Sequence, residues 1–79
     1  MLDLSEIIKS LINEYIEFPN ELAVTEDDGE STVLIQINAR REDRSKIIGK
    51  GGRNITALRT IVSAIASKRK FRAIIHVVN

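Results

Sequence analysis

The chain has 79 residues, of which 43% are hydrophobic and 29% charged, with one histidine and no cysteine. This length suits one small domain, and the composition is that of a folded protein rather than of a disordered segment. Disulfides and thiolate metal sites are excluded, and a single histidine cannot build a zinc site or a catalytic triad. We therefore expect no metal, no cofactor and no catalytic residue.

The net charge of +1 conceals an uneven distribution of charge along the chain. Residues 1–30 hold nine acidic residues and one lysine, a net charge of −8, whereas residues 31–79 hold eleven basic and two acidic residues, a net charge of +9. Such asymmetry indicates a polyanionic partner, such as nucleic acid, for the basic part. There is no membrane-span or signal-peptide pattern, so we expect a cytoplasmic protein with no membrane partner.

The first predicted element is an amphipathic helix within residues 1–18. Apolar side chains recur there with the helical period: Leu4, Ile7, Ile8, Leu11, Ile12, Tyr15 and Ile16. Asp3 and Glu6 form a capping-box-like pair at its start, and Pro19 ends it. Because the polar face is acidic, we expect this helix to pack on the core rather than to lie on an anionic membrane.

Residues 21–39 change to a period of two and predict a β-hairpin. Leu22 and Val24 alternate with smaller residues in the first strand, and the acidic segment 27–30 forms the turn. Val33, Ile35 and Ile37 share one face of the second strand. The acidic turn lacks the ligand spacing of a calcium loop, so we expect a solvated hairpin tip.

Residues 43–67 predict a helix, a glycine loop and a second helix. Glu42 or Asp43 can cap a short helix that ends at Ile48. After the loop the helical period returns and ends near Ser67, in the residues Ile55, Leu58, Ile61, Val62, Ile65 and Ala66. Residues 71–78 are rich in Ile and Val and predict a buried strand, in which His76 is a sheet residue rather than a catalyst. The element order α-β-β-α-α-β defines an α+β fold.

The loop between the two helices carries the most specific signal in the chain. Its sequence is Ile47-Ile48-Gly49-Lys50-Gly51-Gly52-Arg53-Asn54-Ile55. Glycine tolerates positive φ and lacks the Cβ that would keep another backbone away, so this loop can press its main chain against a ligand. The helix that follows would direct free N–H groups and the positive end of its dipole towards the loop, as suits a phosphate.

These residues resemble the signature of the K-homology (KH) RNA-binding domain, with Gly49-Lys50-Gly51-Gly52 as its G-x-x-G loop. The element order is similar to the type II form of that domain, and the chain as a whole resembles the small bacterial single-KH-domain proteins of the KhpA family. This resemblance covers essentially all of residues 1–79. It implies a type II KH fold, in which helices cover one face of a three-stranded sheet.

The resemblance also implies a site for about four unstacked nucleotides, held at their backbone by the G-x-x-G loop. Gly49 and Gly52 would shape the turn, while Lys50 and Gly51 approach phosphate. The expected aliphatic floor consists of Ile47, Ile48, Ile55 and Leu58, with Ile35 or Ile37 on the sheet opposite. The expected steering or clamping cations are Arg40, Arg41, Arg44, Lys46, Arg53 and Arg59. Exposed main-chain groups of the strand after the hairpin turn could contact base edges.

The sequence disfavours two other kinds of site. A phosphate-binding enzyme is disfavoured, since the Walker pattern requires Ser or Thr after its lysine and Lys50 is followed by glycine. A base-stacking surface is disfavoured because the chain has only three aromatic residues, each at a position typical of the core. We expect single-stranded RNA as partner, no small-molecule substrate, and a role as an RNA chaperone or post-transcriptional regulator.

The alternative is a protein-pairing module in which RNA binding is secondary. The family resemblance implies a homodimer, a heterodimer with a larger Jag-type KH protein, or both. Because one four-nucleotide site is small, linking two sites would raise avidity without new contacts. Pairing is therefore expected as a companion to RNA binding.

Overall fold

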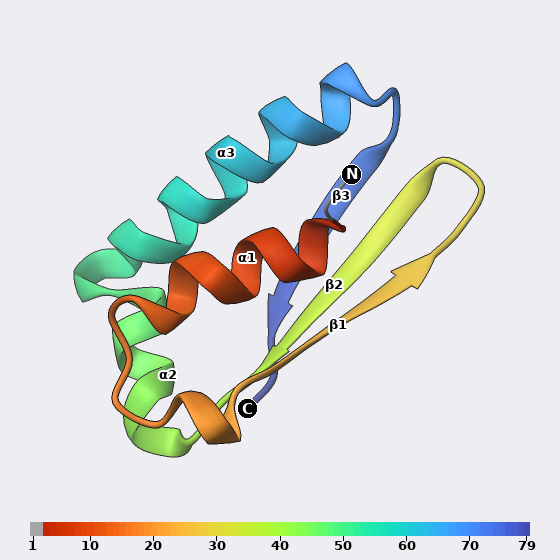
Figure 1. Ribbon diagram of the computed structural model, residues 1–79. Coiled ribbons are helices and arrows are strands. Elements are labelled where there is room, and N and C mark those ends of the chain that lie inside the picture. Colours follow the sequence, from red (N-terminus) through yellow and green to blue (C-terminus); the bar gives the residue numbers. More distant parts are fainter. Residues whose placement is uncertain (1–2) are drawn as a thin grey trace.

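The computed structural model describes residues 3–79. Its elements in chain order (Figure 1) are α1 (Leu4–Asn13), the 3₁₀ turn η1 (Pro19–Glu21), β1 (Ala23–Asp28), β2 (Thr32–Asn38), α2 (Arg41–Ile48), the 3₁₀ turn η2 (Lys50–Gly52), α3 (Arg53–Lys68) and β3 (Arg72–Val77). The predicted α+β class and the order α-β-β-α-α-β are confirmed.

The three strands form one sheet in the order β1-β2-β3. The hairpin pairs β1 and β2 antiparallel, with Val24 opposite Ile37. The chain then crosses over through α2 and α3, so that β3 pairs with β2 in parallel, with Ile75 opposite Ile35. This crossover connection is the ordinary way to join two parallel strands. It makes β2 the central strand and leaves β3 at one edge of the sheet.

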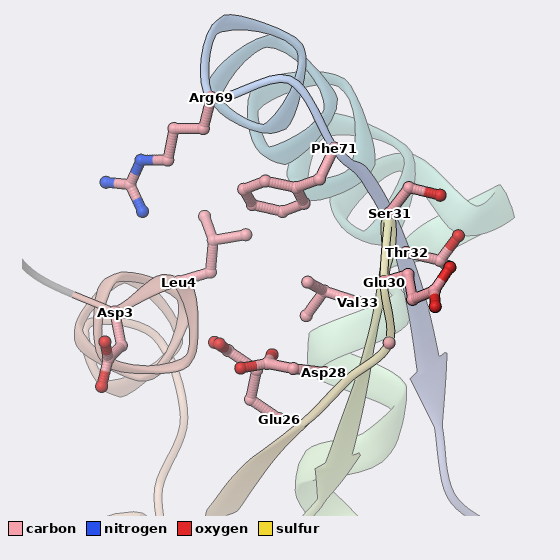
Figure 2. A pocket seen from close by; sticks show the side chains of 11 residues that line it. Asp3, Leu4, Glu26, Asp28, Glu30, Ser31, Thr32, Val33, Arg69 and Phe71 are labelled. Carbon is pink, nitrogen blue, oxygen red and sulfur yellow. The ribbon is translucent and has the colours of Figure 1, made fainter.

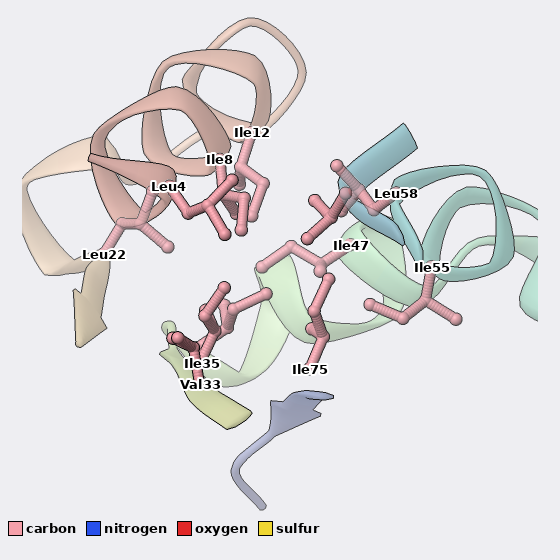
Figure 3. Packing of buried hydrophobic residues seen from close by; sticks show 12 residues of the cluster. Leu4, Ile8, Ile12, Leu22, Val33, Ile35, Ile47, Ile55, Leu58 and Ile75 are labelled. Atoms are coloured by element: carbon pink, nitrogen blue, oxygen red, sulfur yellow. The ribbon is translucent and has the colours of Figure 1, made fainter. Parts of the chain in front are cut away.

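All three α-helices lie on one face of the sheet (Figure 1). The core lies between them and the strands, as Figure 3 shows for side chains from every layer. Val33, Ile35 and Ile37 of β2 are buried on this face, which confirms the predicted alternation. The core contains these twelve residues: Leu4, Ile8, Ile12, Leu22, Val33, Ile35, Ile37, Ile47, Ile55, Leu58, Val62 and Ile75.

The N-terminal helix is shorter than the predicted span to residue 18, since α1 ends at Asn13. The segment after it is held by a tertiary contact that a longer helix would prevent. The buried carboxylate of Asp43, in the first turn of α2, accepts hydrogen bonds from the backbone N–H groups of Glu17 (3.0 Å) and Phe18 (2.8 Å). Asp43 is therefore a support for this loop and not the predicted cap of α2, which begins at Arg41 without a side-chain cap.

The predicted capping pair of α1 does not form. Asp3 occupies the N-cap position, but its side chain makes no capping hydrogen bond. The N–H of Ser5 in the first helical turn instead donates to Oε1 of Glu26 on β1, at 3.2 Å. A carboxylate from the sheet thus takes the place of a local cap, which also suits the helix dipole.

Two expectations for the strands also need correction. Asp27 and Asp28 belong to β1 rather than to the turn, which Gly29 closes by donating its N–H to the carbonyl of Thr32 at 2.7 Å. The last strand is not buried as a whole, because it lies at the sheet edge with one open face. Among its residues only Ile75 is buried, and Ile74 on the open face is 44% exposed.

Within residues 3–79, no helix has the length and apolar character needed to span a bilayer.

Candidate nucleic-acid interface

The glycine loop is a tight left-handed turn between α2 and α3. Gly49, Gly51 and Gly52 have φ values of +81°, +66° and +79°, in the region that favours glycine. The N–H of Gly49 donates to the carbonyl of Ser45 at 2.8 Å, and that of Gly52 donates to the carbonyl of Gly49 at 3.0 Å. Lys50 and Gly51 begin the turn, so their amides have no partner within it. Both residues are exposed to solvent.

Asn54, in the first turn of α3, holds the glycine loop by connecting α3 to the end of α2. Its side-chain amide donates to the carbonyl of Lys46 near the end of α2, at 2.8 Å. A Cβ on Gly49 would lie 2.8 Å from Cγ and 2.8 Å from the backbone nitrogen of Asn54. Gly51 and Gly52, by contrast, have nothing within 4 Å of such a Cβ. The inner side of the loop is therefore closed against α3, and the outer side is open.

This difference predicts unequal effects of alanine in the loop. Gly51→Ala meets only the backbone penalty of positive φ and should lower the free energy of unfolding by about 1 kcal/mol. Gly49, with φ +81° and ψ 167°, has a backbone conformation that is essentially restricted to glycine. Gly49→Ala therefore meets a larger backbone penalty and also a clash with Asn54, so it should lower the free energy of unfolding by about 2 kcal/mol or more. Urea denaturation of the two variants measures both values. Equal losses would contradict the described packing of Asn54 behind Gly49.

The aliphatic residues predicted to contact the bases differ in their exposure to solvent. Ile47, Ile55 and Leu58 are buried in the core, at 0%, 6% and 5% exposure. They hold the two helices on the sheet, and Leu58 also lines a depression between α1 and α3. Ile48, the last residue of α2, is 37% exposed beside the loop. It alone of this predicted set is exposed at the loop.

The prediction that Ile35 or Ile37 of the sheet contacts the bases is wrong. Ile35 and Ile37 are fully buried beneath the helices. They belong to β2, whose two edges are occupied by β1 and β3, so the main chain of the strand after the hairpin turn is not free to contact bases. The free sheet edge near α3 belongs to β3. There the carbonyl of Ile75 accepts a hydrogen bond from Nη2 of Arg59 at 3.2 Å.

The predicted cations also divide into groups. Arg40 lies before α2, which at eight residues places it about 12 Å from the glycine loop. It forms ion pairs with Glu21 and Glu42, both at 3.0 Å, and stacks on the ring of Phe18 at 4.1 Å. The hydrogen bonds to Glu21 and then Glu42 raise the pKa of Arg40 above its ordinary value. Arg40 therefore has a structural role at η1.

The remaining cations lie nearer to the loop. Lys46 pairs with Glu17 at 2.6 Å, so one acidic side chain reduces its charge. The Nε atom of Arg44 is buried without a hydrogen-bond partner. Lys50 and Arg53 are exposed at the loop itself, and Arg41 is exposed at the far end of α2. Lys50 and Arg53 are thus the charges that the structure places at the turn.

Away from the loop, an acidic depression of about 270 Å³ lies between the start of α1 and the hairpin (Figure 2). Burial, together with the neighbouring carboxylates of Asp28 and Asp3, raises the pKa of Glu26. Within residues 3–79 no cluster of His, Cys, Asp or Glu side chains is suited to a metal ion. Arg69, at the end of α3, also lines this depression, so the acidic side chains there face a basic one.

An apolar depression of about 430 Å³ lies between α1 and α3. Its lining includes Leu11, Tyr15 and Ile61, which are 40%, 38% and 50% exposed. Burial raises the pKa of the Tyr15 hydroxyl, so this side chain remains neutral. Exposed apolar side chains grouped in this way are typical of a surface that contacts another protein.

The fold and the loop together define a class of protein. A helix precedes a three-stranded sheet, the sheet is covered on one face, and a G-x-x-G turn joins the two helices of the parallel crossover. This arrangement is that of a type II KH domain, as the sequence predicted.

Comparison with known proteins identifies the family within this class. Residues 5–77 match the KhpA/KhpB KH-domain family, and the chain belongs to that family. It is 35% identical over 77 residues to the RNA-binding protein KhpA of Aquifex aeolicus, with 98% of each chain covered. It is 33% identical over 75 residues to that of Caldanaerobacter subterraneus subsp. tengcongensis, which covers 95% of this chain and 100% of the relative.

A further relative, the RNA-binding protein KhpA of Chlamydia pneumoniae, is 32% identical over 69 residues, or 87% of this chain and 88% of its own. These relatives are named as RNA-binding proteins and not as enzymes. The match to this family confirms the prediction that the chain is not an enzyme.

The sequence did not predict the structural roles of Asn54, which holds the glycine loop, and of Asp43, which holds the segment after α1. For Asp43 it predicted a cap of α2 instead. An asparagine at the start of a helix is a signal for a side-chain bond to nearby backbone, so Asn54 could have been found. Asp43 could not, because its partners Glu17 and Phe18 lie 26 and 25 residues away in the sequence.

Proposed function

We propose that this protein binds single-stranded RNA without catalysis, by clamping the sugar-phosphate backbone with the loop Gly49–Gly52. The observation that carries this proposal is the open outer side of the loop. Three residues of positive φ expose the main chain of Lys50 and Gly51, and apart from adjoining residues of the chain no atom lies within 4 Å of a Cβ built on Gly51 or Gly52. A phosphate can approach the amides there as closely as it approaches a helix N-terminus.

The charges at the loop favour the same ligand. Lys50 and Arg53 flank the turn, and the dipole of α3, a helix of 16 residues, points its positive end at it. Arg44, Lys46 and Arg41 add positive potential along α2 and attract an anionic strand. Four of the nine acidic residues among the first thirty lie on the hairpin, namely Glu26, Asp27, Asp28 and Glu30. Their negative charge favours binding of the RNA at the glycine loop rather than at the hairpin.

Aliphatic contact with the bases is proposed for Ile48. Its exposure next to Gly49 allows a base to rest on it while the loop holds the neighbouring phosphate. Ile47, Ile55 and Leu58 support this surface from the core. Affinity then comes mainly from the backbone clamp, since the aromatic residues Tyr15, Phe18 and Phe71 are not part of the glycine loop.

The dependence of binding on salt tests this mode. If about three or four cations engage phosphates, the logarithm of the association constant should fall with the logarithm of salt concentration with a slope of about −2 to −3. Fluorescence anisotropy of a labelled oligonucleotide at several salt concentrations gives the slope. A flat response would contradict a phosphate clamp and would favour the protein-pairing module.

We further propose that the protein acts in the cytoplasm as an RNA chaperone or post-transcriptional regulator together with a protein partner. The depression between α1 and α3 supports pairing, because Leu11, Tyr15 and Ile61 expose apolar side chains there. Its lining extends to Asn54, which packs against Gly49, so a second copy or a larger Jag-type KH protein held there would lie next to the glycine loop. Two linked sites would raise the avidity for a longer strand.

Pairing through this surface has a direct test. Leu11→Glu places a charge on the exposed rim of the depression and should dissociate a homodimer, with the fold unchanged. Sedimentation velocity over a range of concentrations compares the variant with the unmodified protein. A chain that sediments as a monomer at high concentration, before any substitution, would contradict self-association.

A further inference from the structure

The free edge of β3 and the neighbouring face of α3 form a seam that continues from the glycine loop. Arg59 and Ser63 are four residues apart on α3 and so share one helix face. Ser63 lines a depression of about 260 Å³ together with Ala73 of β3. Next to it, Arg59 reaches across to Ile75. A strand of RNA held at the loop would extend along this seam.

The hydrogen bonds of β3 reveal which of its main-chain groups face the seam. Arg72 and Val78 donate their N–H groups to Ser31 and Ile37, on the side of β2. In a parallel ladder, alternate residues direct their amide groups to opposite sides of the strand. The amide groups of Ala73, Ile75 and Val77 therefore face away from β2, at the free edge.

Arg59 changes the set of hydrogen-bond donors and acceptors that the free edge of β3 presents to a ligand. Its Nη2 donates to the Ile75 carbonyl at 3.2 Å and so occupies the acceptor in the middle of the edge. A guanidinium has five N–H donors and no acceptor, so further donors remain around the point of contact. A free strand edge normally alternates N–H donors and carbonyl acceptors. Here the Ile75 carbonyl is occupied, so the middle of the edge presents only donors, from the Arg59 guanidinium and from the N–H groups of Ile75 and Val77.

We propose that Arg59 determines the base preference of this edge, favouring cytosine and guanine over adenine. The inference rests on the proposed function, since it concerns a base carried there by RNA at the loop. Cytosine has neighbouring acceptors at N3 and O2, and guanine at O6 and N7, so each can accept two bonds from adjacent donors. Adenine places its N6 amino donor beside N1 and N7, and that donor would face the donors of Arg59.

The test compares oligouridines in which a single A, C or G is placed at each position in turn. Binding is measured for the unmodified protein, for Arg59→Met and for the control Arg53→Met. The control removes one exposed positive charge from the same helix, and within residues 3–79 the Arg53 side chain makes no hydrogen bond to β3 of the kind that Arg59 makes. Both residues are exposed, so a thermal melt should show an unchanged fold for both variants.

For the unmodified protein, C or G at the best position should bind about fivefold or more tightly than A at that position. Arg59→Met should abolish this ratio or shift it towards adenine, since the Ile75 carbonyl becomes free to accept from N6. Arg53→Met should weaken all oligonucleotides alike and keep the ratio. A ratio that is unchanged in Arg59→Met, or a preference of the unmodified protein for adenine, would overturn the role of Arg59 and leave RNA binding intact. If the unmodified protein binds none of these oligonucleotides, the proposed function fails and the inference fails with it.

Discussion

The double substitution Lys50→Asp with Gly51→Asp is expected to abolish RNA binding in a protein that remains folded. It replaces one positive charge with a negative charge and adds another at the proposed phosphate contact. Each unit of charge at about 4 Å changes the interaction by about 1 kcal/mol even in water, so a loss of about a hundredfold in affinity is expected. Both side chains would point into open solvent, so the core is not disturbed.

The matched control is Lys50→Asn with Gly51→Asn. It has the same side-chain shapes and the same positive φ at residue 51, where Asn and Asp are better tolerated than most residues. The control should keep most of the affinity that the loop amides provide, losing only the contribution of the lysine. Anisotropy titrations measure affinity, and circular dichroism measures the fold. Unchanged RNA affinity in the folded Asp variant would contradict the clamp.

Asp43→Ala is expected to lower the free energy of unfolding by about 3 kcal/mol. The carboxylate is fully buried and accepts hydrogen bonds from the N–H groups of Glu17 and Phe18. Removing it leaves two partly buried N–H donors without their acceptor, each at a penalty of about 1 to 3 kcal/mol. The favourable position of the carboxylate in the first turn of α2 is also lost.

Urea denaturation measures this loss. The control is Asp27→Ala, which removes an exposed carboxylate from β1 and should change stability by less than about 0.5 kcal/mol. Asp43→Asn should fall between the two, because one amide oxygen can replace only one of the two acceptors. If Asp43→Ala were as stable as Asp27→Ala, the carboxylate would not hold the loop between α1 and β1 as described.

The periodicity of the sequence predicted the elements well because each period reports on one element alone. The alternation of Val33, Ile35 and Ile37 identified the buried face of β2. The glycines of the loop were equally informative, since their positive φ is a local property of the turn. The fold class and the class of domain followed from these local signals and their order.

The errors arose where a partner distant in sequence decided the outcome. The N-terminal helix was expected to continue to residue 18, but Asp43 binds the amides of Glu17 and Phe18 from across the molecule. The last strand was expected to be buried because its composition is apolar. Composition alone does not tell whether a strand is central or at an edge, and only the pairing of β3 with β2 shows that β3 is an edge strand.

The candidate site was predicted at the level of the loop and less well around it. Adjacent isoleucines in a helix face different directions, and the sequence does not tell which one faces the sheet. The structure buries Ile47 and exposes Ile48. The charges near the loop were likewise predicted without their partners, so the ion pairs of Arg40 with Glu21 and of Lys46 with Glu17 were missed.

The amide resonances of the protein, followed while single-stranded RNA is added, locate the binding surface most directly. The glycine-loop clamp predicts the largest shifts at residues 49–54, with smaller shifts along the start of α3 and the free edge of β3. Shifts confined to the open face of the sheet or to the depression between α1 and α3, with the loop amides unmoved, would contradict it.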